Sequence, residues 1–322
     1  MLQRFLKNNK IKIIAIFVIG MSLMMGLFIY NRYRNNILCN KQTVMAKEYL
    51  ESGDYNQAIE HYENALTMKN SDKELLSIGL AEAYIGNNEY DKALEVLRVY
   101  YEVTAEKSVK EKIEEVTLRK ADYEYEKIIS SGDVYFSNEE YDKAILEYEK
   151  AKKVKSKEVA AYEKKAESLV NMKLYILAQE ELLEGIAITN NERLNEELKE
   201  VEYFIIKQQY DSLIAKAKEF AYQENYQDAI LQYKEAVALS PKEVQGYIEL
   251  AEIYLVQEKY DDIIDLLAGI NNEIYNEDIR RIFENAVVLK EEERKKQEAL
   301  NEFYDKLEPD KYRQLPVPDI DY

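Results

Sequence analysis

This sequence of 322 residues has few of the side chains that perform catalysis or hold metal ions. It contains one histidine (His61), one cysteine (Cys39) and no tryptophan. These counts exclude an internal disulfide, the usual zinc sites, and Ser-His or Cys-His nucleophile arrangements that need a second partner. We therefore predict a non-enzymatic protein with no catalytic, cofactor-binding or metal-binding residues.

Turn-forming residues are also scarce. Only 9 Gly and 4 Pro occur, which is too few for a fold with many strands, and 33% of the residues are charged. Residues that favour helices are abundant, so the sequence predicts an all-α protein. The net charge of −18 makes nucleic acid a poor partner.

One long apolar run stands near the amino terminus. Eighteen residues from Ile13 to Tyr30 carry no charge, which at about 1.5 Å per residue is close to the thickness of a bilayer core. The flanking basic residues are Arg4, Lys7, Lys10 and Lys12 before the run, and Arg32 and Arg34 after it. This bias predicts a transmembrane anchor within segment 1–34, with the amino terminus in the cytoplasm and the rest outside.

Two other interpretations of this segment stay open. A cleaved signal peptide has a shorter apolar region and a small-residue cleavage site, neither of which matches this run. A lipoprotein signal at Cys39 would need a small residue before the cysteine, where Leu38 stands instead. We favour the anchor and expect Cys39 to be an unpaired thiol.

A short phrase recurs along the rest of the chain. DYNQAIEHYENAL at 54–66 returns as EYDKALEVL at 89–97, EYDKAILEYEKAK at 140–152, LYILAQEELLEG at 174–185, NYQDAILQYKEAV at 225–237 and KYDDIIDLL at 259–267. Each copy follows a small residue on a preceding predicted helix: Ala46, Ala81, Gly132, Ala166, Ala217 and Ala251. Each also has Tyr at the start of its second helix: Tyr55, Tyr90, Tyr141, Tyr175, Tyr226 and Tyr260. Three residues later come Ala58, Ala93, Ala144, Ala178, Ala229 and Ile263.

In pattern and spacing these copies resemble the tetratricopeptide repeat (TPR), a helix-turn-helix unit of about 34 residues. The resemblance covers about residues 38–290 and implies six repeats stacked as a solenoid of helical hairpins. Ile263 departs from the small residue expected there, so we predict that it pushes the sixth helix pair apart.

The copies are spaced unevenly, at intervals of 35, 51, 34, 51 and 34 residues between the small residues. A two-repeat unit of about 85 residues therefore occurs three times. The extra residues lie around 106–124 and 192–209 and have helical periodicity, so they either lengthen the next first helix or form an additional one. A similar stretch at 277–307 is predicted to cap the solenoid. The resulting domains are the anchor segment 1–34, a solenoid with its cap at 35–308, and a proline-containing extended tail at 309–322.

The resemblance implies a concave groove lined by the first helices, which holds a segment of another protein. The groove positions that follow the small residues are Lys47, Glu82, Asp133, Glu167, Lys218 and Glu252. Four of these six are acidic, which favours a basic or neutral partner segment. His61 is expected to be solvated. PVPDIDY in the tail is either a frayed terminus or a peptide ligand for an SH3-like or strand-pairing domain.

Together these features predict a scaffold or assembly factor that binds other proteins. Its TPR domain would lie outside the cytoplasmic membrane, with residues 13–30 in the lipid bilayer. The alternative is a cytoplasmic TPR adaptor tethered to the same membrane.

Overall fold

The computed structural model describes residues 2–68, 72–270 and 273–306, with side chains from Phe17 onward. These residues form 13 helices and no strand, which confirms the all-α prediction. The tail predicted at 309–322 lies outside the described residues. The chain divides into two compact units, Met1–Ala161 and Tyr162–Tyr322, and each is described by itself.

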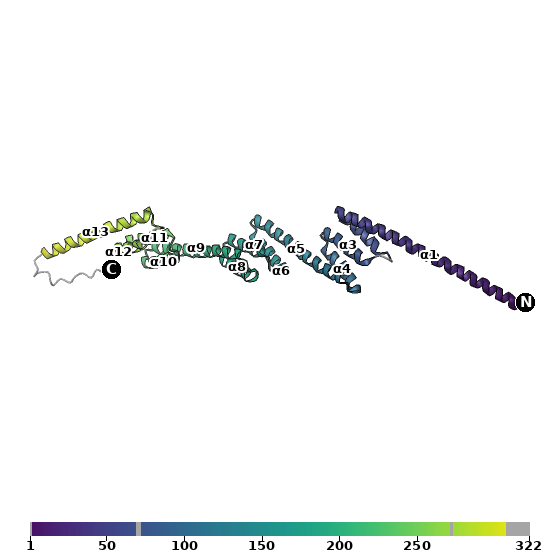
Figure 1. The fold of residues 1–322 in the computed structure, drawn as a ribbon. Coiled ribbons are helices and arrows are strands. Elements are labelled where there is room, and N and C mark those ends of the chain that lie inside the picture. Colours follow the sequence, from purple (N-terminus) through teal and green to yellow (C-terminus); the bar gives the residue numbers. More distant parts are fainter. Residues whose placement is uncertain (1, 69–71, 271–272, 307–322) are drawn as a thin grey trace. The chain divides into compact units, whose positions relative to one another are not determined.

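Unit 1 consists of paired antiparallel helices, visible in the purple to blue-green part of Figure 1. Its elements are α1 (Leu2–Ser52), α2 (Tyr55–Leu66), α3 (Lys73–Gly86), α4 (Tyr90–Thr104), α5 (Lys107–Ser137) and α6 (Tyr141–Val154). The next helix, α7 (Val159–Asn171), begins where this unit ends.

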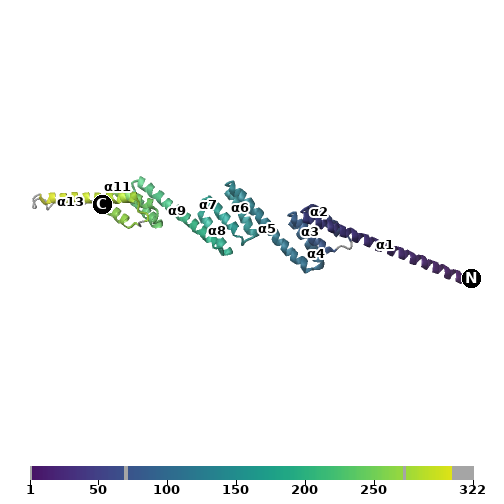
Figure 2. The ribbon, with the colours of Figure 1, turned by 45° about the horizontal axis from the view of Figure 1, so that its top comes forward.

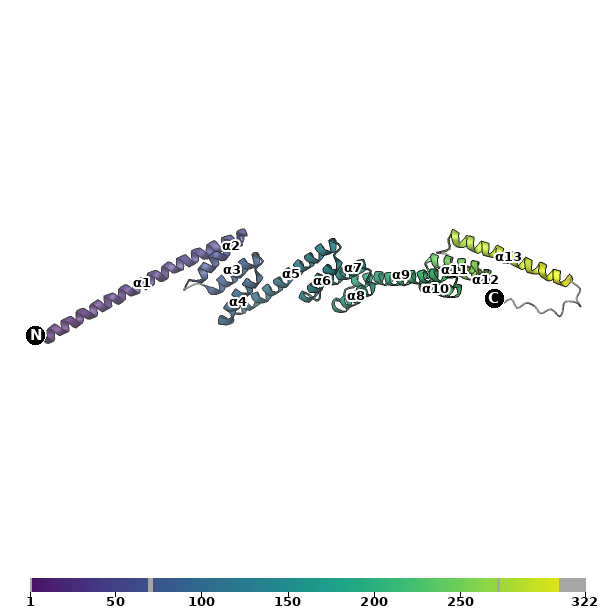
Figure 3. The same cartoon turned by 180° about the vertical axis from the view of Figure 1, so that it is seen from behind.

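Unit 2 continues the same alternation of helices. After α7 come α8 (Tyr175–Thr189), α9 (Arg193–Tyr222), α10 (Tyr226–Leu239), α11 (Val244–Val256), α12 (Tyr260–Ala268) and α13 (Glu277–Lys306). In Figure 3, α9 passes from α8 at one of its ends to α10 and α11 at the other.

The second helix of every repeat begins at the tyrosine that the sequence marks, as predicted. The preceding turn reverses the chain through one residue in the left-handed region, with φ between 57° and 80° in all six repeats. These turn residues are Gly53, Asn88, Glu139, Lys173, Glu224 and Glu258. Only the first is glycine, so the other five turns carry some backbone strain.

The small residues lie where helices touch. Ala46, Ala81, Gly132, Ala166, Ala217 and Ala251 are all buried, and Ala58, Ala93, Ala144, Ala178, Ala229 and Ile263 have no exposed surface. Small side chains at these points let helix axes approach closely. The predicted packing register is confirmed, while the predicted spreading around Ile263 stays a prediction.

The extra residues of each two-repeat unit lengthen a first helix and do not form a separate one. Val109 and Val116, in the first half of α5, belong to the core formed with α1 to α4. Tyr125 and Ile129, in its second half, belong to a core formed with α6. Figure 2 shows α5 running from α3 and α4 toward α6. One long helix therefore closes one pair of repeats and opens the next.

The amino-terminal part of α1 differs from the other helices because it runs ahead of α2 (Figure 1). Its first side chains, up to residue 16, lie outside the described residues, and the predicted span Ile13–Tyr30 begins among them. Within the described part of the chain, no helix has the length and apolar character needed to cross a membrane.

Candidate functional site

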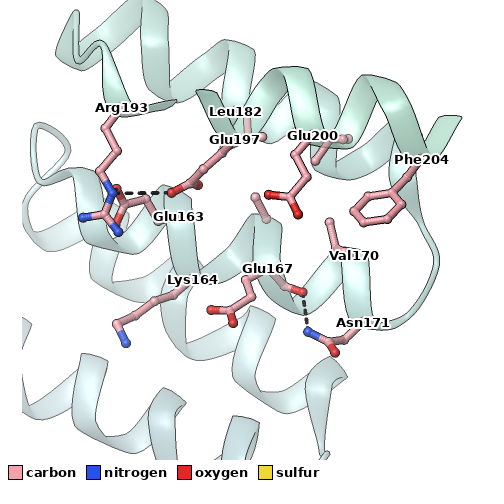
Figure 4. Close-up of a pocket in the computed structure, with 12 residues that line it drawn as sticks. Glu163, Lys164, Glu167, Val170, Asn171, Leu182, Arg193, Glu197, Glu200 and Phe204 are labelled. Carbon is pink, nitrogen blue, oxygen red and sulfur yellow. Dashed lines mark hydrogen bonds and ion pairs between the residues drawn. The ribbon is translucent and has the colours of Figure 1, made fainter. Parts of the chain in front are cut away.

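A pocket opens in unit 2 between α7 and the first half of α9 (Figure 4). Leu182 of α8 lines its floor. The other lining residues are Glu163, Lys164, Ala166, Glu167, Val170 and Asn171 of α7, and Arg193, Glu197, Glu200, Val201 and Phe204 of α9. The pocket therefore combines a strongly acidic region with an apolar one.

Buried residues on both helices place the acidic side chains opposite each other. Ala166 of α7 is 2% exposed and Val201 of α9 is 4% exposed, and both line the pocket. Glu167 follows Ala166 in the sequence, and Glu200 precedes Val201. Figure 4 shows both carboxylates in the hollow between the helices.

Arg193 neutralises one end of the pocket. Its Nε lies 3.1 Å from Oε1 of Glu163 and 3.7 Å from Oε1 of Glu197. Including Glu167 and Glu200, the pocket has four carboxylates against two basic side chains, Arg193 and Lys164. Burial, followed by repulsion from Glu163, raises the pKa of the Glu197 carboxyl. The pocket is thus short of positive charge.

The opposite end of the pocket is apolar. Val170 and Phe204 line it, and the Phe204 ring stacks on Tyr175 with ring centroids 5.4 Å apart. This arrangement suits a side chain with an aliphatic stem and a cationic tip, because the stem can cover apolar wall while the tip reaches the carboxylates. In the described part of the chain, no group of three or more His, Cys, Asp or Glu side chains is arranged to hold a metal ion.

The structure gives the predicted groove residues different environments. Glu82 pairs with Lys112 of α5 at 3.3 Å, and Lys218 pairs with Glu249 at 2.8 Å. Asp133 is half-buried and accepts a 2.8 Å hydrogen bond from the Tyr148 hydroxyl.

The three remaining groove positions, Lys47, Glu167 and Glu252, are exposed, and of the six only Glu167 lines the pocket. Binding of a partner by these residues stays a prediction. The sequence reasoning missed Glu163, Glu197 and Glu200. Comparing α9 with α5 at the 85-residue interval would have drawn attention to Glu197, because Lys112 stands at the equivalent position.

Two single-copy residues also have defined environments. The expectation of a solvated His61 is wrong: its ring is half-buried, lies within hydrogen-bonding distance of Gln42, and stacks on Tyr49 at 5.3 Å. Tertiary contact with α1 decides this. Cys39 is a free, buried thiol directed at the Ala65 carbonyl, with sulfur and oxygen 3.9 Å apart.

Comparison with known structures finds similar proteins at low identity. The TPR domain of P58(IPK) is 15% identical to this chain. The match covers 79% of this chain and 99% of that domain, with a TM-score of 0.28. Yeast Tom70 is 15% identical over 78% of this chain and 69% of its own, with a TM-score of 0.23. A thermophilic TPR protein of Thermus thermophilus is 14% identical over 67% of this chain and 99% of its own, with a TM-score of 0.22. No curated protein sequence matches the chain.

Family models identify the repeats directly in this sequence. Three models, each described as tetratricopeptide repeat, match residues 49–104, 129–158 and 214–269. Each matched segment falls in a different one of the three two-repeat units, and within them the helix starts and buried small residues follow the repeat pattern. The chain is a tetratricopeptide-repeat protein.

Proposed function

We propose that this protein is a non-enzymatic scaffold that binds other proteins through its TPR units and is held at the cytoplasmic membrane by its amino-terminal helix. The observation that carries the binding function is the acidic pocket between α7 and α9, formed by exposed and half-buried polar positions of two repeat helices. TPR arrays use such surfaces for extended or helical segments of their partners.

The described side chains at the start of α1 support the anchor. Every large apolar side chain from Phe17 to Tyr30 is exposed, with values between 54% and 73%. These residues cover all sides of the helix and would face water if nothing covered them. A bilayer removes such a surface from water at a favourable free energy of about 25 cal/mol per Å².

The proposed orientation depends on flanking charge. Four basic residues precede the apolar run and two follow it closely. Cytoplasmic segments next to a membrane helix carry the excess of Lys and Arg, so the repeats would lie outside. The alternative is a cytoplasmic adaptor with the repeats facing inward.

Protease protection tests the anchor and its orientation. Protease is added to intact cells whose outer envelope layers have been opened, and the 37.9 kDa chain is followed with antibodies to each end. Degradation to a small membrane-bound stub is expected. Full protection until the inner membrane is lysed would support the cytoplasmic adaptor, and recovery of the intact chain in the soluble fraction would contradict the anchor.

Crosslinking tests the scaffold function separately. A photoreactive residue at exposed Lys47, or at Glu252, would be activated in living cells and the adducts identified by mass spectrometry. We expect one or a few protein partners, competed by excess unlabelled protein. A matched probe at Arg281, an exposed residue of α13 outside the predicted groove positions, should give no such adduct. Absence of adducts at all sites on both units would contradict the scaffold.

A further inference from the structure

The helix that closes each pair of repeats packs through equivalent residues in all three two-repeat units. One position in this interface, however, holds a different kind of side chain in each unit. Each of these helices has two buried residues at equivalent positions. The first is Val109, Leu194 or Ile279, and the second is Val116, Val201 or Ala286. Equivalent residues are 85 positions apart in the sequence. The register between the three copies is therefore fixed. One turn after the first buried residue stand Lys112, Glu197 and Ile282.

The first copy closes this interface with its own ammonium group. Lys112 Nζ lies 3.3 Å from Oε1 of Glu82 and 3.1 Å from Oε2 of Glu115, and the Lys112 side chain is only 15% exposed. Glu82 and Glu115 thus hold a positive group between α3 and α5 in unit 1.

The third copy closes the interface with an apolar side chain. Ile282 is 9% exposed and belongs to the same core as Ala251. The carboxylate equivalent to Glu115 is replaced there by Asn285, so no pair of acids faces across this contact.

Only the second copy leaves the interface open among the described residues. Glu167 and Glu200 stand at the positions of Glu82 and Glu115, each 85 residues later. A third carboxylate, Glu197, stands at the position of Lys112, 85 residues later. Glu167, Glu197 and Glu200 all line the pocket of Figure 4. Arg193 pairs with Glu163 at 3.1 Å and with Glu197 at 3.7 Å.

We propose that this pocket binds a lysine or arginine side chain of the partner protein, which takes the place that Lys112 occupies in unit 1. The cationic tip pairs with Glu167 and Glu200, as the Lys112 ammonium does with Glu82 and Glu115. The methylene stem packs along Val170 and Phe204. The inference deepens the proposed scaffold function and rests on it, because it names the chemistry of one contact between this chain and its partner.

A peptide titration on the full-length protein in nanodiscs tests the pocket directly. The probe is acetyl-Ala-Arg-Ala-amide, with acetyl-Ala-Lys-Ala-amide as the second cation and acetyl-Ala-Gln-Ala-amide as the neutral control. Methyl NMR signals of Val170, Leu182 and Val201 report binding, since all three residues line the pocket. Both cationic peptides should shift these signals, and the glutamine peptide should not. The shifts should decrease as salt rises.

Exchange of the two equivalent residues provides matched variants. Glu197→Lys recreates the arrangement of unit 1, so it should close the pocket, weaken peptide binding about tenfold and raise the melting temperature. Lys112→Glu should open a second site in unit 1, reported by the Val116 methyl signals. Glu197→Gln keeps the size of the side chain and should bind the peptides more weakly than the parent, but better than Glu197→Lys. Circular dichroism checks that all variants remain helical.

Several outcomes would overturn the proposal. One is the absence of shifts in the parent protein with both cationic peptides; another is equal shifts with the glutamine peptide or in Glu197→Lys. Failure of the scaffold function is distinguished by the cellular crosslinking, which does not depend on these peptides. If partners crosslink equally to the parent and to Glu197→Lys, the scaffold function stands and the pocket proposal is wrong.

Discussion

The long helices α5 and α9 have the same place in the repeat pattern but differ in chemistry. Their buried positions correspond at 85-residue intervals, with Val109 matching Leu194 and Tyr125 matching Tyr210. The polar position beside these residues differs, because Lys112 forms an ion pair with Glu82 whereas the equivalent Glu197 lines a pocket. Both helices keep the buried apolar positions while the polar position beside them changes, so the packing register does not fix the charge at that position.

The largest effect is expected at the buried contact shared by both helices. Leu194→Ala should destabilise unit 2 by about 2–5 kcal/mol, because it removes a fully buried side chain that packs on Gly185 and leaves a cavity. Val109→Ala should cost unit 1 less, about 1–3 kcal/mol, since fewer carbons are lost. Hydrogen exchange measured along a denaturant series gives the free energy of opening for each unit. An equal, negligible loss in both units would mean that the two helices do not share this packing role.

The matched tyrosines should behave differently. The Tyr210 hydroxyl accepts a 2.8 Å hydrogen bond from the buried Gly246 N–H. The Tyr125 hydroxyl faces the equivalent Ala161 backbone, but in the described part of the chain it completes no hydrogen bond of normal geometry. Tyr210→Phe should therefore cost about 1–3 kcal/mol by leaving the Gly246 N–H unsatisfied. Tyr125→Phe should cost less, because its contact with the Ala161 backbone is weaker. Equal losses in the two melting curves would contradict the assigned hydrogen bond.

The left-handed turns before α6 and α10 should respond alike. Glu139 and Glu224 have φ values of 60° and 58°, which cost a residue with a side chain more than glycine. Glu139→Gly and Glu224→Gly should each stabilise their unit by up to about 1 kcal/mol. The reverse change, Gly53→Ala at φ 80°, should destabilise unit 1. A loss of stability in both glycine variants would show that the side chains contribute more than the backbone strain removes.

The smallest effect concerns pH. Burial and the neighbouring carboxylates of Glu163, Glu167 and Glu200 raise the pKa of Glu197, despite the opposing pull of Arg193. A carboxyl whose pKa is higher in the folded protein than in the unfolded chain binds its proton more tightly when folded. It therefore favours folding at low pH and opposes it as pH rises through the raised value.

Glu197→Gln should accordingly stabilise unit 2 near neutral pH, and this advantage should disappear below the ordinary pKa of glutamate. Carbon NMR of the Glu197 carboxyl should show titration above the ordinary range of a glutamate side chain. Titration of the Glu197 carboxyl within the ordinary range of glutamate would remove the electrostatic difference between α5 and α9.

Much of the fold could be predicted from the sequence, because a repeat unit is defined by local spacing. The tyrosines at the helix starts and the alanines at the contacts recur in nearly every copy, and each marks a feature that depends on residues within about 35 positions. The sequence also indicated three two-repeat units. It left undecided whether the extra residues extend a helix or form another, since helical periodicity alone does not show where a helix begins.

The repeat pattern specifies the helices, the buried register and the acidic character of the chain. The folded arrangement of α7 and α9 is needed to bring Glu197 and Glu200 close to Glu163 and Glu167, about 30 residues away in the sequence. The tertiary structure likewise brings the Tyr148 hydroxyl to Asp133, to which it donates a hydrogen bond, and places His61 against α1. The physical reason is that helical periodicity specifies which face a side chain occupies, whereas its charge environment depends on the helix that packs against that face.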